Sequence, residues 1–257
     1  MTEFAFGADN RTTRRVRAIV PKLIAGASDA LNVQAIVDAQ HRVVFPVLAG
    51  WWMFANRTAE AMMVLYERGF TVEAVPLMRN LIGHALAMHW LADNGEPAYN
   101  AFIDESWQSR KKLNDNLTEA KWHLAGVDIG EKPVFTFATV EEEKHHRRLV
   151  GELSKFVNLV NAYGEPMMYP LYRNLSAYTH TTDLTSLAYV KLADDGSLTV
   201  SDQPFVDRLS DLCWMVIPLL QAASVMSPMI KGNPMKTLVT EAVRDLGLPA
   251  DLLPKRH

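Results

Sequence analysis

The chain has 257 residues, a formal net charge of -3 and a sequence pI of about 6.2. Hydrophobic residues make up 49% and charged residues 21%, a composition typical of a globular protein with a sizeable core. These values exclude a global basic field that attracts nucleic acid, and the single cysteine, Cys213, excludes an internal disulfide.

The N-terminal half is dominated by apolar residues at spacings of three and four, which is the pattern of amphipathic helices. Gly69 and the pair Asn94-Gly95 interrupt it and mark expected helix ends. The helices expected here cover 12–38, 43–70, 71–93 and 98–125. A loop containing two glycines and a proline is expected over 126–138.

The second half continues the helical pattern and adds one interruption. Residues 187–201 alternate in polarity and carry an Asp-Asp-Gly turn between two β-prone runs, which predicts a β-hairpin. The helices expected on either side of it cover 139–164, 170–182, 204–229 and 234–246. The predicted fold class is therefore all-α: one helical-bundle domain over 1–257 with a small β-hairpin insertion.

Residues 212–230 form an uncharged stretch of 19 residues. A membrane-spanning helix needs about 20 predominantly apolar residues, so length alone is compatible with a span. Two prolines and several polar residues make the stretch less apolar than a typical span, and nothing else in the chain resembles a membrane segment. We expect a buried bundle helix, no membrane association, and a cytoplasmic location, which the single cysteine also favours.

The stretch "LYRNLSAYTHTTDL", 171–184, places Arg173 and His180 seven positions apart. On a continuous helix this separation is about 20° short of two full turns, so the two side chains share one stripe about 10 Å apart. An imidazole exchanges a proton near neutral pH, and a guanidinium stabilises charge that develops on phosphorus. The same spacing is also common on a solvated helix face, and both side chains would equally serve as structural partners inside a bundle.

The segment "RNLSAYTH" resembles the motif of the HEPN superfamily (higher eukaryotes and prokaryotes nucleotide-binding): Arg, a polar residue, three to five further residues, then His. Members are helical-bundle proteins, often toxins or phage-defence RNases. More closely, "RGFTVEAVPLMRNLIGHALAMHWLADN" with "YRNLSAYTH" is similar to a bacterial family of uncharacterised function. That family usually has an acid four residues after the helix arginine, where this chain has Gly83.

The resemblance implies a metal-independent endoribonuclease of a toxin or phage-defence type that acts on RNA without a cofactor. Its catalytic residues would be His180 as proton carrier, Arg173 as stabiliser of the phosphorane, and Asn174 as an orienting group. The accompanying binding residues would be Ser176, Tyr172, Tyr178, Arg79 and His84. A homodimer across helix 170–182 would supply the second proton carrier. The alternative is a non-catalytic module that binds a nucleotide, another ligand or a protein.

Two competing patterns are weaker. "RNLIGH", 79–84, also has Arg and His around a polar residue, but Arg79 and His84 lie about 140° apart on a straight helix and are not expected to converge. "EEEKHH", 141–146, contains the Glu-x-x-His spacing of ferritin-like carboxylate sites. No second helix carries that spacing, so we expect a solvated helix face and no metal.

Overall fold

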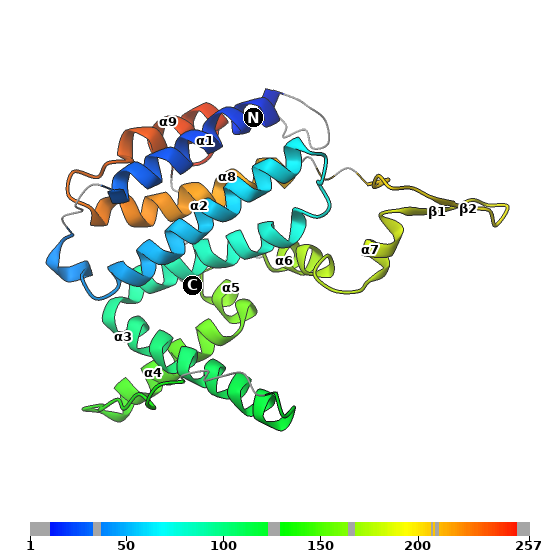
Figure 1. Ribbon diagram of the computed structural model, residues 1–257. Helices are drawn as coiled ribbons and strands as arrows, with labels where there is room; N and C mark the ends of the chain where they lie inside the picture. Colours follow the sequence, from blue (N-terminus) through cyan, green and yellow to red (C-terminus); the bar gives the residue numbers. More distant parts are fainter. Residues whose placement is uncertain are drawn as a thin grey trace.

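The computed structural model describes residues 11–32, 37–122, 129–163, 168–206, 208 and 211–250, and the described part is a helical bundle from which a β-hairpin projects (Figure 1). The predicted fold class is confirmed. The longer helices are α1 (Arg11–Asn32), α2 (Phe45–Glu67), α3 (Val75–Glu119), α4 (Val140–Ser154), α8 (Asp211–Met226) and α9 (Lys236–Leu246). The shorter elements are η1 (Ala39–His41), α5 (Phe156–Tyr163), α6 (Met168–Ala177), α7 (Asp183–Leu187), β1 (Val190–Leu192), β2 (Leu198–Val200) and η2 (Ser227–Met229).

Helix α8 lies in the interior of the bundle and packs against α1, α2 and α3. Together with η2 it forms the segment Asp211–Met229, which is the one segment of the described residues that is long and apolar enough to cross a membrane, and 72% of that window is buried in the fold. The same hydrophobic core contains large buried side chains of its neighbours, among them Trp52 of α2 and Leu81 of α3. The uncharged stretch thus contributes the central layer of the hydrophobic core.

Helix α3 is kinked where the sequence predicted a break between two helices. Gly95 has φ 60° and ψ −137°, a conformation that glycine adopts at low cost. Pro97 follows and has no N–H to donate to the carbonyl one turn earlier. Beyond the kink the distal half of α3 leaves the bundle and packs against α4 (Figure 1).

The helix expected over 139–164 is divided in two. Lys155 is extended, with φ −139° and ψ 126°, and separates α4 from α5. The carbonyl of Gly151, freed near the end of α4, accepts hydrogen bonds from Asn158 Nδ2 at 2.5 Å and from Ser154 Oγ at 3.1 Å. These two side-chain donors replace main-chain N–H groups of the helical ladder at the break.

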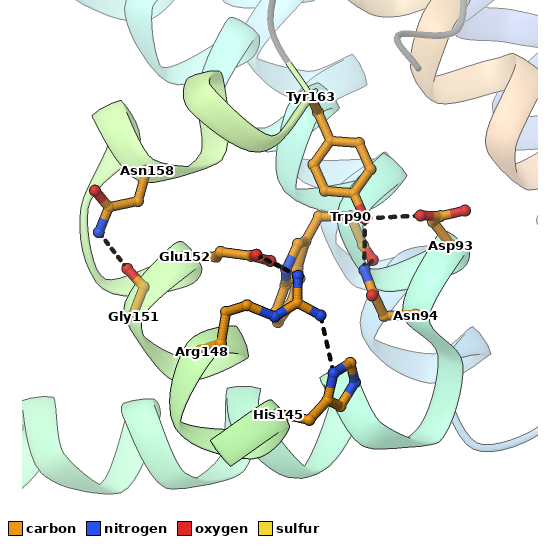
Figure 2. A network of polar contacts seen from close by, with 9 residues as sticks. All are labelled: Trp90, Asp93, Asn94, His145, Arg148, Gly151, Glu152, Asn158 and Tyr163. Carbon is orange, nitrogen blue, oxygen red and sulfur yellow. Dashed lines mark hydrogen bonds and ion pairs between the residues drawn. The ribbon is translucent and has the colours of Figure 1, made fainter. Parts of the chain in front are cut away.

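A polar network holds α4 and α5 on α3 (Figure 2). The buried Glu152 of α4 accepts hydrogen bonds from Trp90 Nε1 at 3.0 Å and from Arg148 Nη1 at 3.1 Å. The buried Tyr163 of α5 donates to Asp93 Oδ2 and accepts from Asn94 Nδ2, both at 2.7 Å. Burial, and then the hydrogen bond to Asp93, raise the pKa of Tyr163 well above its usual range.

The helix expected over 170–182 ends at Ala177, so the prediction of one continuous helix there is wrong. Thr182 causes the end: its Oγ1 donates to the carbonyl of Ala177 at 2.8 Å and accepts from the backbone N–H of Thr185 at 3.4 Å. Thr182 is thereby the N-cap of α7. His180 consequently lies in the turn between the two helices, and the single stripe expected for Arg173 and His180 does not exist.

The predicted hairpin is confirmed. Strands β1 and β2 pair antiparallel, with Val190 opposite Val200 and Leu192 opposite Leu198, and the hairpin extends away from the bundle (Figure 1). Gly196 has φ 80° in the turn, which explains the glycine after two aspartates. The predicted loop before α4 is also confirmed over its described part, 129–138.

Candidate functional site

A cavity of about 250 Å³ lies where α2, α3, α5 and α6 meet, together with the end of α4. Four rings form much of its wall: Trp51, His84, Phe156 and Tyr172. Arg79 and Asn80 are its other polar residues, and the small residues Gly83 and Ala87 also line it. We call this space the Arg79 cavity.

The Arg79 guanidinium is held in place by α6. Its Nε donates to Ser176 Oγ at 2.9 Å, and its Cζ lies 4.6 Å from the centroid of the Tyr172 ring. Tyr172 in turn stacks on Phe156, with ring centroids 3.6 Å apart and planes 15° from parallel. Within the described part of the chain, Nη1 and Nη2 make no hydrogen bond and no ion pair. A half-buried cation is therefore fixed in orientation without a carboxylate partner.

His84 lies at the other side of the same cavity. Its Nδ1 donates to the carbonyl of Asn80 at 2.8 Å, which in the neutral ring leaves Nε2 as a hydrogen-bond acceptor. The ring packs on Phe54, with centroids 4.6 Å apart, and lies edge-on to Trp51 at 6.5 Å. Among the described residues Nε2 has no hydrogen-bond partner. The cavity thus contains one oriented cation and one titratable ring nitrogen.

Helix geometry explains why Arg79 and His84 share a cavity although they do not share a stripe. If Arg79 is set at 0°, Gly83 lies at about 40°, Ala87 at about 80° and His84 at about 140° around the axis. Because Gly83 and Ala87 are small, they leave an open floor between the longer side chains of Arg79 and His84. The hydrogen bond to Ser176 of α6 holds the Arg79 side chain at this floor. Arg79 and His84, which were not expected to converge, thus line one cavity on a helix that is regular between them.

The predicted residues divide into two groups in the structure. Arg79, His84 and Tyr172 line the Arg79 cavity, and Ser176 contributes by accepting a hydrogen bond from Arg79. Arg173 and His180 are exposed and line none of the cavities described here. Their proposed roles stay predictions.

Asn174 and Tyr178 lie beside a different arginine, Arg208. The Asn174 Oδ1 accepts from the Arg208 guanidinium at 3.4–3.5 Å, and the Tyr178 ring centroid lies 5.0 Å from its Cζ. Arg208 also forms an ion pair with Asp211 at 2.7 Å, and both of those side chains are largely buried. This cluster fastens α6 to the start of α8, which is a structural use for two of the predicted site residues.

The sequence pattern alone did not identify Trp51, Phe156, Asn80 or the open floor as parts of the site. Trp51 has no polar pattern around it that indicates a site, and Phe156 comes from a helix whose start was not predicted. The available signal was the pair of small residues, Gly83 and Ala87, one and two turns after Arg79. Small residues beside a long cation leave space on a helix face.

Two larger cavities, of about 520 and 500 Å³, lie on either side of the loop before α4. Several charged residues in and beside them are paired, whereas Glu141 and Lys132 form no ion pair with any described residue. His146 Nε2 lies 3.1 Å from Asp104 Oδ2, Arg148 donates to His145 Nδ1 at 2.8 Å, and Arg147 is paired with Glu143. In the part of the chain that the structure describes, no three His, Cys, Asp or Glu side chains are grouped as metal ligands. The Arg79 cavity is the better candidate because its cation is half-buried and held in orientation without a carboxylate partner among the described residues, whereas Lys132 is exposed.

Comparison with known proteins gives the family. Residues 45–197, more than half of the chain, match the profile described as "Family of unknown function (DUF5677)", and the chain belongs to this family. The matched region includes every residue that lines the Arg79 cavity and excludes α1, α8 and α9. No curated protein and no solved structure matches the chain. The similarity to an uncharacterised family is confirmed, and the site lies inside the shared region.

Proposed function

We propose that this member of the family is a helical binding module that holds the phosphate of a nucleotide or of RNA at Arg79. The observation that carries the proposal is the half-buried guanidinium whose Nη1 and Nη2 have no partner among the described residues. Ser176 and Tyr172 fix its orientation, so little side-chain entropy remains to be lost on binding. A planar guanidinium with two free nitrogens suits bidentate contact with phosphate.

The rest of the cavity supports a ligand with a flat body. Aromatic rings stack on nucleobases without strong sequence preference, and Trp51 and Phe156 face the same space as Arg79. Asn80 adds an amide, which both donates and accepts hydrogen bonds. A net charge of -3 gives no global basic field to dominate binding, so affinity would depend on local contacts such as those of this site.

A second candidate is a metal-independent endoribonuclease of the HEPN-like type. One observation favours it: Arg79 and His84, from a segment that itself has the Arg-polar-His pattern, line one cavity. In this form His84 exchanges the proton through Nε2 and Arg79 stabilises the charge on phosphorus. Arg173 and His180 are exposed and separated by the end of α6, so a site made from them needs a second chain, as in the predicted homodimer.

The binding proposal is tested by isothermal titration with pyrophosphate, AMP and a short single-stranded RNA. Arg79→Gln is compared with the matched control Arg173→Gln, which removes the same charge from the exposed face of α6. We expect Arg79→Gln to weaken binding by about tenfold or more, because a charge-assisted hydrogen bond is lost, and the control to bind like wild type. A larger loss in the control than in Arg79→Gln would refute the assignment to this cavity.

Catalysis is tested separately by incubating single-stranded RNA with wild type, His84→Ala and His180→Ala, each with and without EDTA. The ribonuclease candidate at the Arg79 cavity requires EDTA-resistant cleavage that His84→Ala abolishes and His180→Ala preserves. The reverse pattern would move the activity to the predicted pair in α6 and the following turn. Equal cleavage by all three proteins would mean a contaminating nuclease.

A further inference from the structure

The segment 131–137, between the distal half of α3 and the start of α4, has an unpaired backbone. Its residues form no helix and no strand, and none of their N–H or C=O groups bonds to any described residue. Main-chain donors and acceptors are strong hydrogen-bonding groups that folded proteins normally pair or leave to water. A stretch of this length therefore offers a row of groups to an incoming chain.

The side chains of the segment alternate as in an extended strand. Pro133, Phe135 and Phe137 are half-buried, whereas Val134 and Thr136 between them are exposed. Val134 is 89% exposed. A period of two places successive side chains on opposite sides of an extended chain. One side is thus attached to the protein and the other is presented to solvent.

The attachment depends on the phenylalanine side chains. The rings of Phe135 and Phe137 lie 4.7 and 5.1 Å from the ring of His146, measured between centroids. His146 of α4 is buried and paired with Asp104 of α3, so the imidazole on which the two phenylalanine rings pack is held by α3 and α4. The segment is consequently held in place without using its backbone.

The two largest described cavities flank this segment. The cavity of about 520 Å³ is lined by Val134–Phe137 and by Glu141 and Glu142 of the first turn of α4. Among the described residues its lining also has His145 and His146 but no lysine or arginine, so its fixed charges are acidic. Its charge therefore favours a basic side chain, and its volume accommodates one beside the strand.

We propose that the 131–137 segment is a docking strand for an extended peptide of a partner protein, which carries a basic residue among apolar ones. The peptide lies along the side of the segment that faces the cavity of about 520 Å³, and its backbone pairs with the unpaired N–H and C=O groups of the segment. Its basic side chain enters that cavity near Glu141. Strand addition of this kind takes affinity from main-chain hydrogen bonds and specificity from pockets for alternate side chains. The surface is separate from the Arg79 cavity and does not depend on it.

The probe is a terminally blocked heptapeptide that alternates valine and threonine around a central lysine, titrated by fluorescence anisotropy. Two companion peptides replace lysine by glutamate, or carry N-methyl groups on alternate amides. On the protein, Thr136→Pro removes one exposed N–H, and Thr136→Ala is the matched control that keeps it. Hydrogen exchange reports whether the amides of 134–137 are protected by the peptide.

We expect the lysine peptide to bind and to slow exchange at 134–137. Thr136→Pro should weaken binding roughly five- to tenfold, and the alanine control should not. The N-methylated and glutamate peptides should bind more weakly to the wild-type protein, a comparison that does not depend on any variant folding. Absence of binding at about 1 mM lysine peptide, or equal binding by the N-methylated peptide, would overturn the proposal.

Discussion

Two substitutions at Gly83 separate the stability of α3 from the chemistry of the Arg79 cavity. Gly83 is in a helix interior, where glycine is less favourable than alanine by about 1 kcal/mol. A Cβ added at this position meets no atom within 4 Å, so alanine introduces no clash. Gly83→Ala should therefore raise the free energy of unfolding by about 1 kcal/mol, which corresponds to a rise in Tm of about 2–4 °C for a chain of this size.

Gly83→Glu adds the same Cβ and also a carboxylate one helical turn after Arg79. At this spacing the two side chains are neighbours on the helix surface, and an ion pair contributes only about 0.2–0.5 kcal/mol to stability. Its effect on ligand binding should be much larger, because the carboxylate occupies the open floor and competes for the free guanidinium nitrogens. We expect anion affinity to fall by at least about tenfold in the glutamate variant and to stay unchanged in the alanine variant.

The assays are urea denaturation followed by circular dichroism, and titration with pyrophosphate. A loss of stability in Gly83→Ala would show that the space above Gly83 is occupied, which contradicts the cavity. Undiminished pyrophosphate binding by a folded Gly83→Glu protein would show that Arg79 is not the anion site.

Two further predictions concern the fold around the site. Tyr163→Phe should lower the free energy of unfolding by about 1–2 kcal/mol at pH 7, since Asp93 and Asn94 lose their shared partner. Burial raises the pKa of Tyr163 above its value of 10.0 in the unfolded chain, so the unfolded state loses the phenol proton first as pH rises. The wild type should therefore lose stability as pH rises above about 10, whereas the phenylalanine variant, which has no phenol proton at this position, should not. Urea midpoints at pH 7 and about pH 10.5 measure this, and a difference that is constant with pH would contradict it. Thr182→Ala should cost about 1 kcal/mol by removing the cap of α7 and the bond to the carbonyl of Ala177, and unchanged amide exchange across α7 would contradict that prediction.

The sequence by itself determined the features that depend on local backbone chemistry. The kink of α3 follows from Gly95 and Pro97, and the hairpin turn follows from the glycine at 196 with β-prone runs on each side. The long uncharged stretch was identified as an interior helix because its apolar residues must be buried somewhere. Each of these sequence features determines the conformation of the residues next to it, so it can be recognised without knowledge of the tertiary structure.

Two local signals were present and were outweighed in our interpretation by helical periodicity. Thr182 ends α6, and Ser154 and Asn158 bond to the main chain where the helix expected over 139–164 is divided. Both are decided by competition between side-chain and main-chain hydrogen bonds, in which a difference of about 1 kcal/mol is sufficient. The predicted pairing of Arg173 with His180 depended on the first of these and does not hold within one helix.

Only the tertiary structure decided where the candidate site lies. The hydrogen bond from Arg79 to Ser176 joins residues 97 positions apart, and the stacking of Tyr172 on Phe156 depends on how α5 turns after Lys155. Neither contact follows from spacing along one helix, because each is set by the packing of α5 and α6 against α3 and against each other. The sequence supplied an arginine, a histidine and a small-residue floor on one helix, and the packing of α6 against that helix placed them around one cavity.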